Sequence, residues 1–151
     1  MMAFRVARPS HLIDINRIGE LDRLLVEEGT LRIGATVRHA ALESMVGGGT
    51  LGCLLREVAR FVGHPPIRNR GTFCGSLAHA DPAAEWCLVV ATLNATIVVR
   101  SARCVRAIAA ADFFQGVMTT SLAADELVTA ASKTIRVVSE KVVQSLRDTV
   151  A

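Results

Sequence analysis

The length and composition of the chain predict a single globular domain. It has 151 residues, of which 51% are hydrophobic and 21% are charged, a balance that excludes an intrinsically disordered chain. Seventeen basic and fourteen acidic side chains give a net charge of +3. Because the excess is not gathered into a block of one sign, the charge does not indicate a nucleic-acid-binding protein.

The N-terminus and the cysteines favour a cytoplasmic protein. The first ten residues, MMAFRVARPS, contain arginines and no apolar core, so no secretory signal is expected. The longest uncharged run, 86–99, is shorter than the roughly 20 residues that cross a bilayer, so no membrane span is expected either. The spacing of the four cysteines matches neither a zinc site nor an iron–sulfur site, which favours reduced thiols and no metal: Cys53, Cys74, Cys87 and Cys104.

In the N-terminal part, a short apolar run and an alternating segment predict strands. Residues 11–16, HLIDIN, predict one strand. Residues 21–37, LDRLLVEEGTLRIGATV, alternate around Glu28 and Gly29 and predict a β-hairpin.

Two helices are expected next. Residues 38–46, RHAALESMV, suit a short helix that the glycines at 47–49 interrupt. Residues 51–63, LGCLLREVARFVG, place apolar side chains at i, i+3, i+4 and i+7, with Gly63 expected as the C-terminal cap.

The second half continues the irregular alternation of helices and strands. Residues 83–93, AAEWCLVVATL, predict a helix with Pro82 in its first turn, and the aperiodic stretch from residue 69 up to it is expected to be a loop. The remaining predicted elements are strands at 95–100 and 102–109, a helical turn capped by Asp112, an extended segment at 125–138 and a helical tail with Val142, Val143 and Leu146 on its apolar face. This pattern favours an α+β fold over a doubly wound parallel sheet.

The expected loop, NRGTFCGSLAHADPAAEW at 69–86, combines glycines and hydroxyls in the way an anion site requires. Gly71, Thr72, Gly75 and Ser76 can turn several backbone N–H groups and two hydroxyls toward one point, and such a nest binds phosphate. The charged side chains around it would serve the phosphate and the ribose of a nucleotide: Arg68, Arg70, Asp81 and Glu85.

A simpler interpretation of the same stretch stays open. Glycine pairs often make turns without a ligand, Arg68 and Arg70 can be solvated or paired with carboxylates, and Asp81 suits a helix cap equally well. His64 fits a polar loop residue, and His79 has no nucleophile beside it. Because the sequence contains no Walker loop, dinucleotide fingerprint or Ser/His/Asp order, no catalytic residue is predicted.

Several motifs in order resemble one enzyme family. They are RVARPSHLIDINRI, LRIGATVRHAALE, GHPPIRNRGTFCGSLAHADPAAEW and DFFQGVMTTSLAADELV, spread over about residues 4–128. Together they resemble the FAD-binding medium subunit of the molybdenum hydroxylases, such as carbon monoxide dehydrogenase and xanthine dehydrogenase. The resemblance implies the larger lobe of a PCMH-type FAD-binding domain, with a mixed or antiparallel sheet and flanking helices. One domain over 1–151 is expected, with 129–151 as a divergent tail.

The resemblance also implies a cofactor, a site and partners. Family members hold FAD between a first glycine-rich loop and a second loop. The second loop corresponds here to Thr72, Phe73, Cys74, Gly75 and Ser76, with His79 and Glu85 at further contact positions. The family relays electrons from the iron–sulfur clusters of a small subunit, next to a molybdenum-cofactor large subunit, through FAD to an external acceptor. None of this requires a catalytic acid or base, or a metal ligand, in this chain.

Two departures from the family pattern lead to further expectations. The first glycine-rich loop is expected to lie outside this chain, so the chain corresponds to a piece shortened at both ends. Cys74 stands where the family loop has glycine, and a side chain there is expected to cost roughly 1 kcal/mol or more of cofactor binding. These departures support an alternative function, a noncatalytic remnant or interaction module that binds no flavin.

Overall fold

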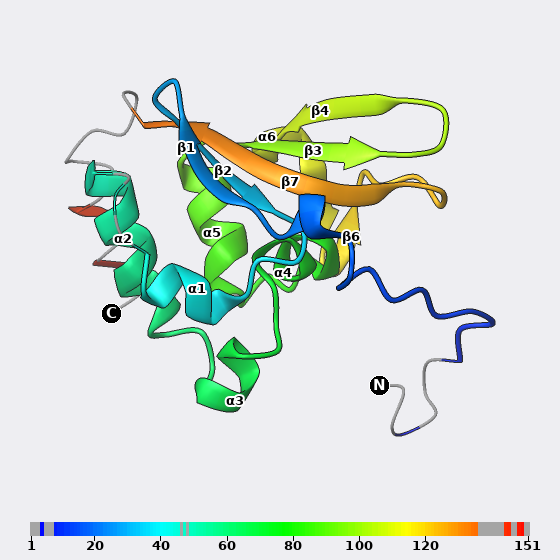
Figure 1. Cartoon of the computed structure of the whole chain (residues 1–151), viewed down its shortest axis with the longest axis horizontal. Coiled ribbons are helices and arrows are strands. Elements are labelled where there is room, and N and C mark those ends of the chain that lie inside the picture. The colour runs from blue at the N-terminus through cyan, green and yellow to red at the C-terminus, as the bar shows by residue number, and fades with distance from the viewer. Residues whose placement is uncertain are drawn as a thin grey trace.

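The computed structural model describes residues 4, 8–45, 47, 49–135, 144–145 and 148–149. Its main feature is a five-stranded antiparallel sheet in the order β1-β2-β7-β3-β4 (Figure 1), which confirms the α+β prediction. The strands of this sheet are β1 (Leu24–Glu27), β2 (Thr30–Gly34), β3 (Thr96–Arg100), β4 (Val105–Ala109) and β7 (Leu127–Thr134), and β5 (Phe114–Gly116) pairs separately with β6 (Thr119–Thr120). The helices are α1 (His39–Glu43), α2 (Gly49–Ala59), α3 (Pro65–Arg68), α4 (Phe73–His79), α5 (Glu85–Thr92) and α6 (Ala110–Phe113), with a 3-10 turn η1 (Gly19–Leu21).

The predicted β-hairpin is present and its turn explains its register. Glu27 pairs with Thr30 across a two-residue loop. The loop residues Glu28 and Gly29 have φ values of 49° and 73°, as a type I′ turn requires. The prediction of this hairpin from the alternating sequence is therefore confirmed.

Strand β7 joins two hairpins that are distant in sequence. Ala131 of β7 lies opposite Ile33 of β2 on one side and opposite Ile97 of β3 on the other. The predicted strands around 95–100, 102–109 and 125–138 are confirmed as β3, β4 and β7 over the described residues. The sheet is thus complete only when the C-terminal strand enters its centre.

The helices α1, α2, α4 and α5 lie on one face of the sheet and form the core with it (Figure 1). The predicted stripe of α2 is buried throughout: Leu51, Leu54, Leu55, Val58 and Ala59. This helix ends at Ala59, so the prediction that Gly63 caps it is wrong. Gly63 has φ +52° and instead closes the turn that follows the helix.

Three other local predictions are wrong. Residues 11–15 have no regular secondary structure, and Leu12 and Ile13 are 73% and 85% exposed, because the run pairs with no strand among the described residues. Asp112 lies inside α6, whose N-cap is Ala109. The helix α5 begins at Glu85, so Pro82 precedes it rather than occupying its first turn.

The remaining sequence expectations concern the tail and the cellular location. Val142, Val143 and Leu146 lie outside the described residues. Among the residues that are described, no helix is both long and apolar enough to span a membrane. All four cysteines are free thiols, and the cytoplasmic location stays a prediction.

Candidate functional site

The stretch expected to be a loop contains a helix. Residues 73–79 form α4, preceded by the short helix α3. Thr72 is the N-cap of α4, and its hydroxyl oxygen accepts a hydrogen bond from the Gly75 N–H at 3.1 Å. The helix ends at Ala80, which has φ 52°. The loop prediction is wrong because a helix of this length offers too few positions for its period to be recognised.

A second segment of the chain fixes where α4 begins. The Phe73 N–H donates to the Val37 carbonyl at 3.0 Å, and the His39 N–H donates to the Gly71 carbonyl at 3.2 Å. Between these bonds, Arg38 and Thr72 form an isolated antiparallel bridge. The segment after β2 therefore holds the first turn of α4 by strand-like pairing.

Most amides of this first turn already have protein partners. Besides the bonds of Phe73 and Gly75, the Ser76 N–H donates to the Thr72 carbonyl at 3.1 Å. Only the Cys74 N–H of residues 73–76 has no recorded partner within the described part of the chain. The expected nest of several unpaired amides is thus not formed, and hydroxyls and the helix N-terminus are the groups left to meet a ligand.

The predicted cofactor residues divide between the core and the surface. Phe73 and Cys74 are buried, Gly75 and His79 are exposed, and Ser76 is half-buried. The Cys74 thiol donates to the Ile33 carbonyl in the sheet at 3.6 Å, and burial raises its pKa to about 12. The side chain of Cys74 therefore points away from the surface, a position that argues against obstruction, and the expected loss of cofactor binding stays a prediction.

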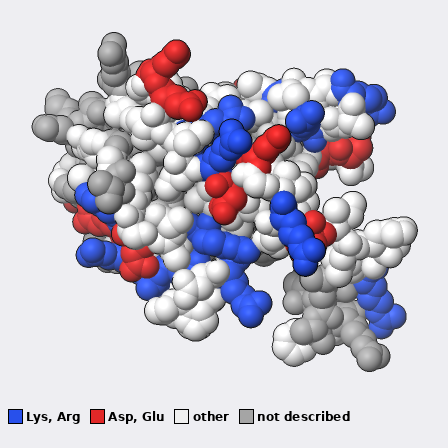
Figure 2. All heavy atoms as spheres, viewed as in Figure 1, with Lys and Arg blue, Asp and Glu red and all other residues white. Residues whose placement is uncertain are grey.

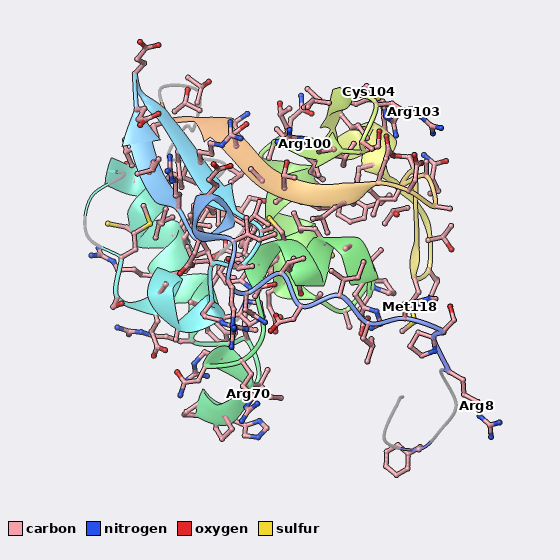
Figure 3. The ribbon with its side chains drawn as sticks, turned by 45° about the vertical axis from the view of Figure 1, so that its right-hand side comes forward. Arg8, Arg70, Arg100, Arg103, Cys104 and Met118 are labelled. Atoms are coloured by element: carbon pink, nitrogen blue, oxygen red, sulfur yellow. The ribbon has the colours of Figure 1, made fainter. Side chains whose placement is uncertain are left out.

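Positive charge surrounds the start of α4. The Arg38 guanidinium donates to the Arg70 carbonyl and, at 2.6 Å, to Oδ1 of Asn16. Figure 2 shows basic side chains in blue over α1, α3 and the start of α4, and all of them in this part of the chain are arginines. Figure 3 shows Arg70 at the surface beside α3, on the loop that leads to α4. Arg68 is different, because it is held in an ion pair with Glu43 at 3.0 Å.

Sequence reasoning missed Arg38 and Asn16 as neighbours of this site. Arg38 stands within the LRIGATVRHAALE motif, but nothing local distinguishes it from a solvated arginine. Its position depends on contacts with residues 22 and 32 positions away. Only the folded chain brings these groups together.

The acidic residues at the other end of the stretch take separate roles. Oδ1 of Asp81 accepts the Ala83 N–H at 2.9 Å, while the N-cap of α5 is Ala84, so Asp81 closes a turn and does not cap the helix. Glu85 is half-buried and lines a surface hollow of about 330 Å³ with Phe61 and Leu88. Within the described residues, no hydrogen bond or ion pair joins Glu85 to the first turn of α4.

A buried histidine, also missed, lies directly behind the site. Nδ1 of His39 accepts a hydrogen bond from the Trp86 indole N–H at 2.9 Å. Burial and the nearby Arg38 guanidinium lower the pKa of His39 to about 4. His39 is therefore neutral at pH 7 and is part of the buried core behind the first turn of α4.

Comparison with known proteins decides the family. Residues 1–132 match the sequence profile described as the FAD binding domain in molybdopterin dehydrogenase. The chain belongs to this family. The fold and the cofactor, FAD, are therefore those of this family, as the motif resemblance implied.

Individual members of the family are similar in sequence and structure. The nicotine 6-hydroxylase medium subunit of Paenarthrobacter nicotinovorans is 43% identical over 129 residues, which cover 85% of this chain and 46% of that protein. The carbon monoxide dehydrogenase medium chain of Hydrogenophaga pseudoflava is 38% identical over 84% of this chain and 44% of its own length. The solved structure of quinoline 2-oxidoreductase from Pseudomonas putida 86 matches with a TM-score of 0.84 and 38% identity over 88% of this chain and 47% of that chain. The chain spans less than half the length of these relatives.

The groups at the first turn of α4 fit one part of FAD, its diphosphate. A Cβ at Gly75 would lie 2.6 Å from Thr72 Oγ1. Apart from α4 itself and the adjoining residues, no other described residue comes within 4 Å, so the surface beside Gly75 is open to a ligand. The Thr72 and Ser76 hydroxyls can donate hydrogen bonds there, and Arg38 and Arg70 supply positive charge. The donor set is that of an anion site built on hydroxyls and guanidinium groups.

Proposed function

We propose that this chain binds FAD with its diphosphate against the turn formed by Thr72–Ser76. The observation that supports this site is the open surface at Gly75, which lies at the N-terminus of α4 with two arginines nearby. A helix N-terminus and cationic side chains both favour a negatively charged group. His79, on the exposed side of α4, and Glu85, at the start of α5, are proposed as further contacts.

The proposed role of the bound cofactor is electron relay. FAD, when bound, supplies the redox chemistry, and the residues of this chain bind and orient it. We propose that the electrons come from iron–sulfur clusters on a small subunit, that a large subunit carries the molybdenum cofactor, and that an external acceptor receives the electrons. The support is that the relatives are named as medium subunits or medium chains.

Flavin titration tests the proposed site. Purified protein is mixed with FAD, and the quenching of flavin fluorescence gives the dissociation constant. Arg70→Gln and Ser76→Ala are each expected to weaken binding about five-fold, as the loss of one charged or polar contact to a phosphate should. Arg100→Gln is the matched control, because Arg100 lies on the β3–β4 hairpin away from Arg70 (Figure 3).

The outcomes separate the proposal from its alternative. Selective weakening in Arg70→Gln and Ser76→Ala supports the diphosphate site. Equal affinity of the wild type and the three variants for FAD would show that FAD binds at another surface. A folded wild-type chain that binds no FAD at millimolar concentration would favour the noncatalytic module that keeps the fold without the flavin.

A further inference from the structure

A line of buried contacts connects α5 to the residue that precedes the cap of α4. Trp86 in α5 is fully buried and donates its indole N–H to Nδ1 of His39, which is 4% exposed. The two rings are stacked with centroids 6.1 Å apart. Because Nδ1 accepts this hydrogen bond, the ring proton of neutral His39 lies on Nε2.

The opposite edge of the His39 ring lies against Gly71. A Cβ at Gly71 would be 2.6 Å from Nε2 and 2.8 Å from Cδ2 of His39. The backbone N–H of His39 also donates to the Gly71 carbonyl. Gly71 directly precedes Thr72, so His39 holds the start of the proposed diphosphate turn with both its backbone and its ring.

We propose that His39 is a positioning residue for the flavin site: oriented by Trp86, it fixes Gly71 and Thr72, and thereby the shape of the exposed turn of α4. This inference rests on the proposed function, because it assigns the control of that same site. A second ring proton on His39 would stand on Nδ1 and face the indole N–H. The acceptor for Trp86 would then be lost and the ring would have to move.

Burial first, and the Arg38 guanidinium second, lower the pKa of His39 and keep it in its neutral form at pH 7. The charged residues on the elements packed around it are the following: Arg38 at the N-cap of α1, Glu43 on α1, Arg56 and Glu57 on α2, Arg68 on α3, Arg70 in the loop and Glu85 on α5. Glu43 is already engaged in an ion pair. Together with burial, Arg38 lowers the pKa of His39 to about 4, so the hold on Gly71 is released only in acid.

Three variants distinguish the effect of losing the acceptor for the Trp86 N–H from the effect of losing the ring and from a general effect of losing a histidine. His39→Asn keeps an oxygen near the position of Nδ1 and does not titrate. His39→Phe keeps a ring but leaves the buried Trp86 N–H without an acceptor. His64→Asn is the matched control, because His64 is exposed and lies outside this line of contacts.

Two readouts do not depend on flavin. Trp86 is the only tryptophan of the chain, so its fluorescence should change with a midpoint near pH 4 in the wild type and in His64→Asn, but not in His39→Asn. At neutral pH, hydrogen exchange of the bonded amides of Phe73, Gly75 and Ser76 should be about ten-fold faster in His39→Phe and within about three-fold of wild type in His39→Asn. Wild-type exchange in a folded His39→Phe protein would overturn the inference.

Flavin affinity gives the third readout and separates the two proposals. FAD should bind about ten-fold more weakly to His39→Phe than to wild type at neutral pH, and His39→Asn should restore most of the affinity. Wild-type affinity in folded His39→Phe would overturn the inference.

If the wild type binds no FAD, the proposed function fails, while hydrogen exchange and tryptophan fluorescence still decide whether His39 holds the start of α4. If His39→Phe does not fold, Trp86→Phe removes the donor instead, and unchanged exchange at 73–76 would then overturn the inference.

Discussion

The missing side chain of Gly71 makes room for the imidazole ring of His39. A Cβ on Gly71 would approach Nε2 of His39 to 2.6 Å, a distance at which one of the two groups must move. Gly71→Ala is therefore expected to lower the free energy of unfolding by about 2 kcal/mol, the usual cost of overpacking a buried site. Urea denaturation measures this change.

A second glycine provides the control for that substitution. Gly19 has no atom within 4 Å of its missing Cβ, so Gly19→Ala should change stability by less than about 0.5 kcal/mol. Equal effects of the two substitutions would show that the His39 ring does not press against Gly71.

The lowered pKa of His39 predicts a loss of stability on mild acidification. The unfolded chain takes up a proton on this residue as the pH falls through 6.5, whereas the folded chain does so only near pH 4. The contribution of neutral His39 to the free energy of unfolding is therefore fully present above pH 6.5. It declines between pH 6.5 and pH 4, and it does not decline further below pH 4. The loss is about 3 kcal/mol. Unfolding free energies of wild type and His39→Asn, measured across this pH range, should diverge; parallel curves would contradict the assignment.

The N-cap of α4 predicts a specific role for the Thr72 hydroxyl. Thr72 Oγ1 is the acceptor for the Gly75 N–H, and the loss of such a cap costs about 1 kcal/mol. Thr72→Val, which keeps the shape of the side chain, should therefore lower the melting temperature by about 3 °C. Thr72→Ser keeps the acceptor and should stay within about 1 °C of wild type. A Val variant as stable as the Ser variant would exclude a stabilising cap.

The buried position of Cys74 reverses the expectation drawn from the family pattern. Its side chain is 2% exposed and packs against the sheet. Cys74→Gly should thus lower the free energy of unfolding by about 2 kcal/mol, through the lost packing and the poor helix propensity of glycine. FAD affinity should stay within about two-fold of wild type, because the side chain does not face the ligand surface. Tighter binding by Cys74→Gly, measured by flavin titration, would show that the cysteine does obstruct the cofactor.

The four thiols should fall into two classes of reactivity. Cys53 and Cys104 are exposed, whereas Cys74 and Cys87 are buried. Burial raises the pKa of Cys74 to about 12 and that of Cys87 to about 11, so few thiolates form there at neutral pH. A disulfide reagent at neutral pH should label two thiols quickly in the folded protein and all four in urea. Rapid labelling of a third thiol in the folded protein would contradict the buried positions.

Local sequence features predicted the elements whose cause is local. The turn at Glu28 and Gly29 could be recognised because residues with positive φ belong in a two-residue hairpin loop. The stripe of α2 could be recognised because its apolar residues repeat with the helical period over three turns. Residues 11–15 misled the same reasoning, since an apolar run forms a strand only where another strand offers hydrogen bonds.

The candidate site was only partly predictable. The motif predicts the residues of the Thr72–Ser76 turn, but it does not predict their helical conformation or the inward position of Cys74. The roles of His39, Trp86 and Arg38 left no local signal, because each depends on a partner brought close by folding. The Trp86 and His39 side chains that form a hydrogen bond are 47 positions apart in the chain.

The amino-acid sequence by itself determined the α+β class, the hairpins and the family, because backbone preferences, periodicity and ordered motifs are properties of neighbouring residues. The tertiary structure alone decided that β7 lies between β2 and β3, that Cys74 faces the core and that His39 supports Gly71. These features arise from burial and hydrogen bonding between distant segments. The direction in which a side chain points, and the residue it contacts, are determined only when those segments pack together.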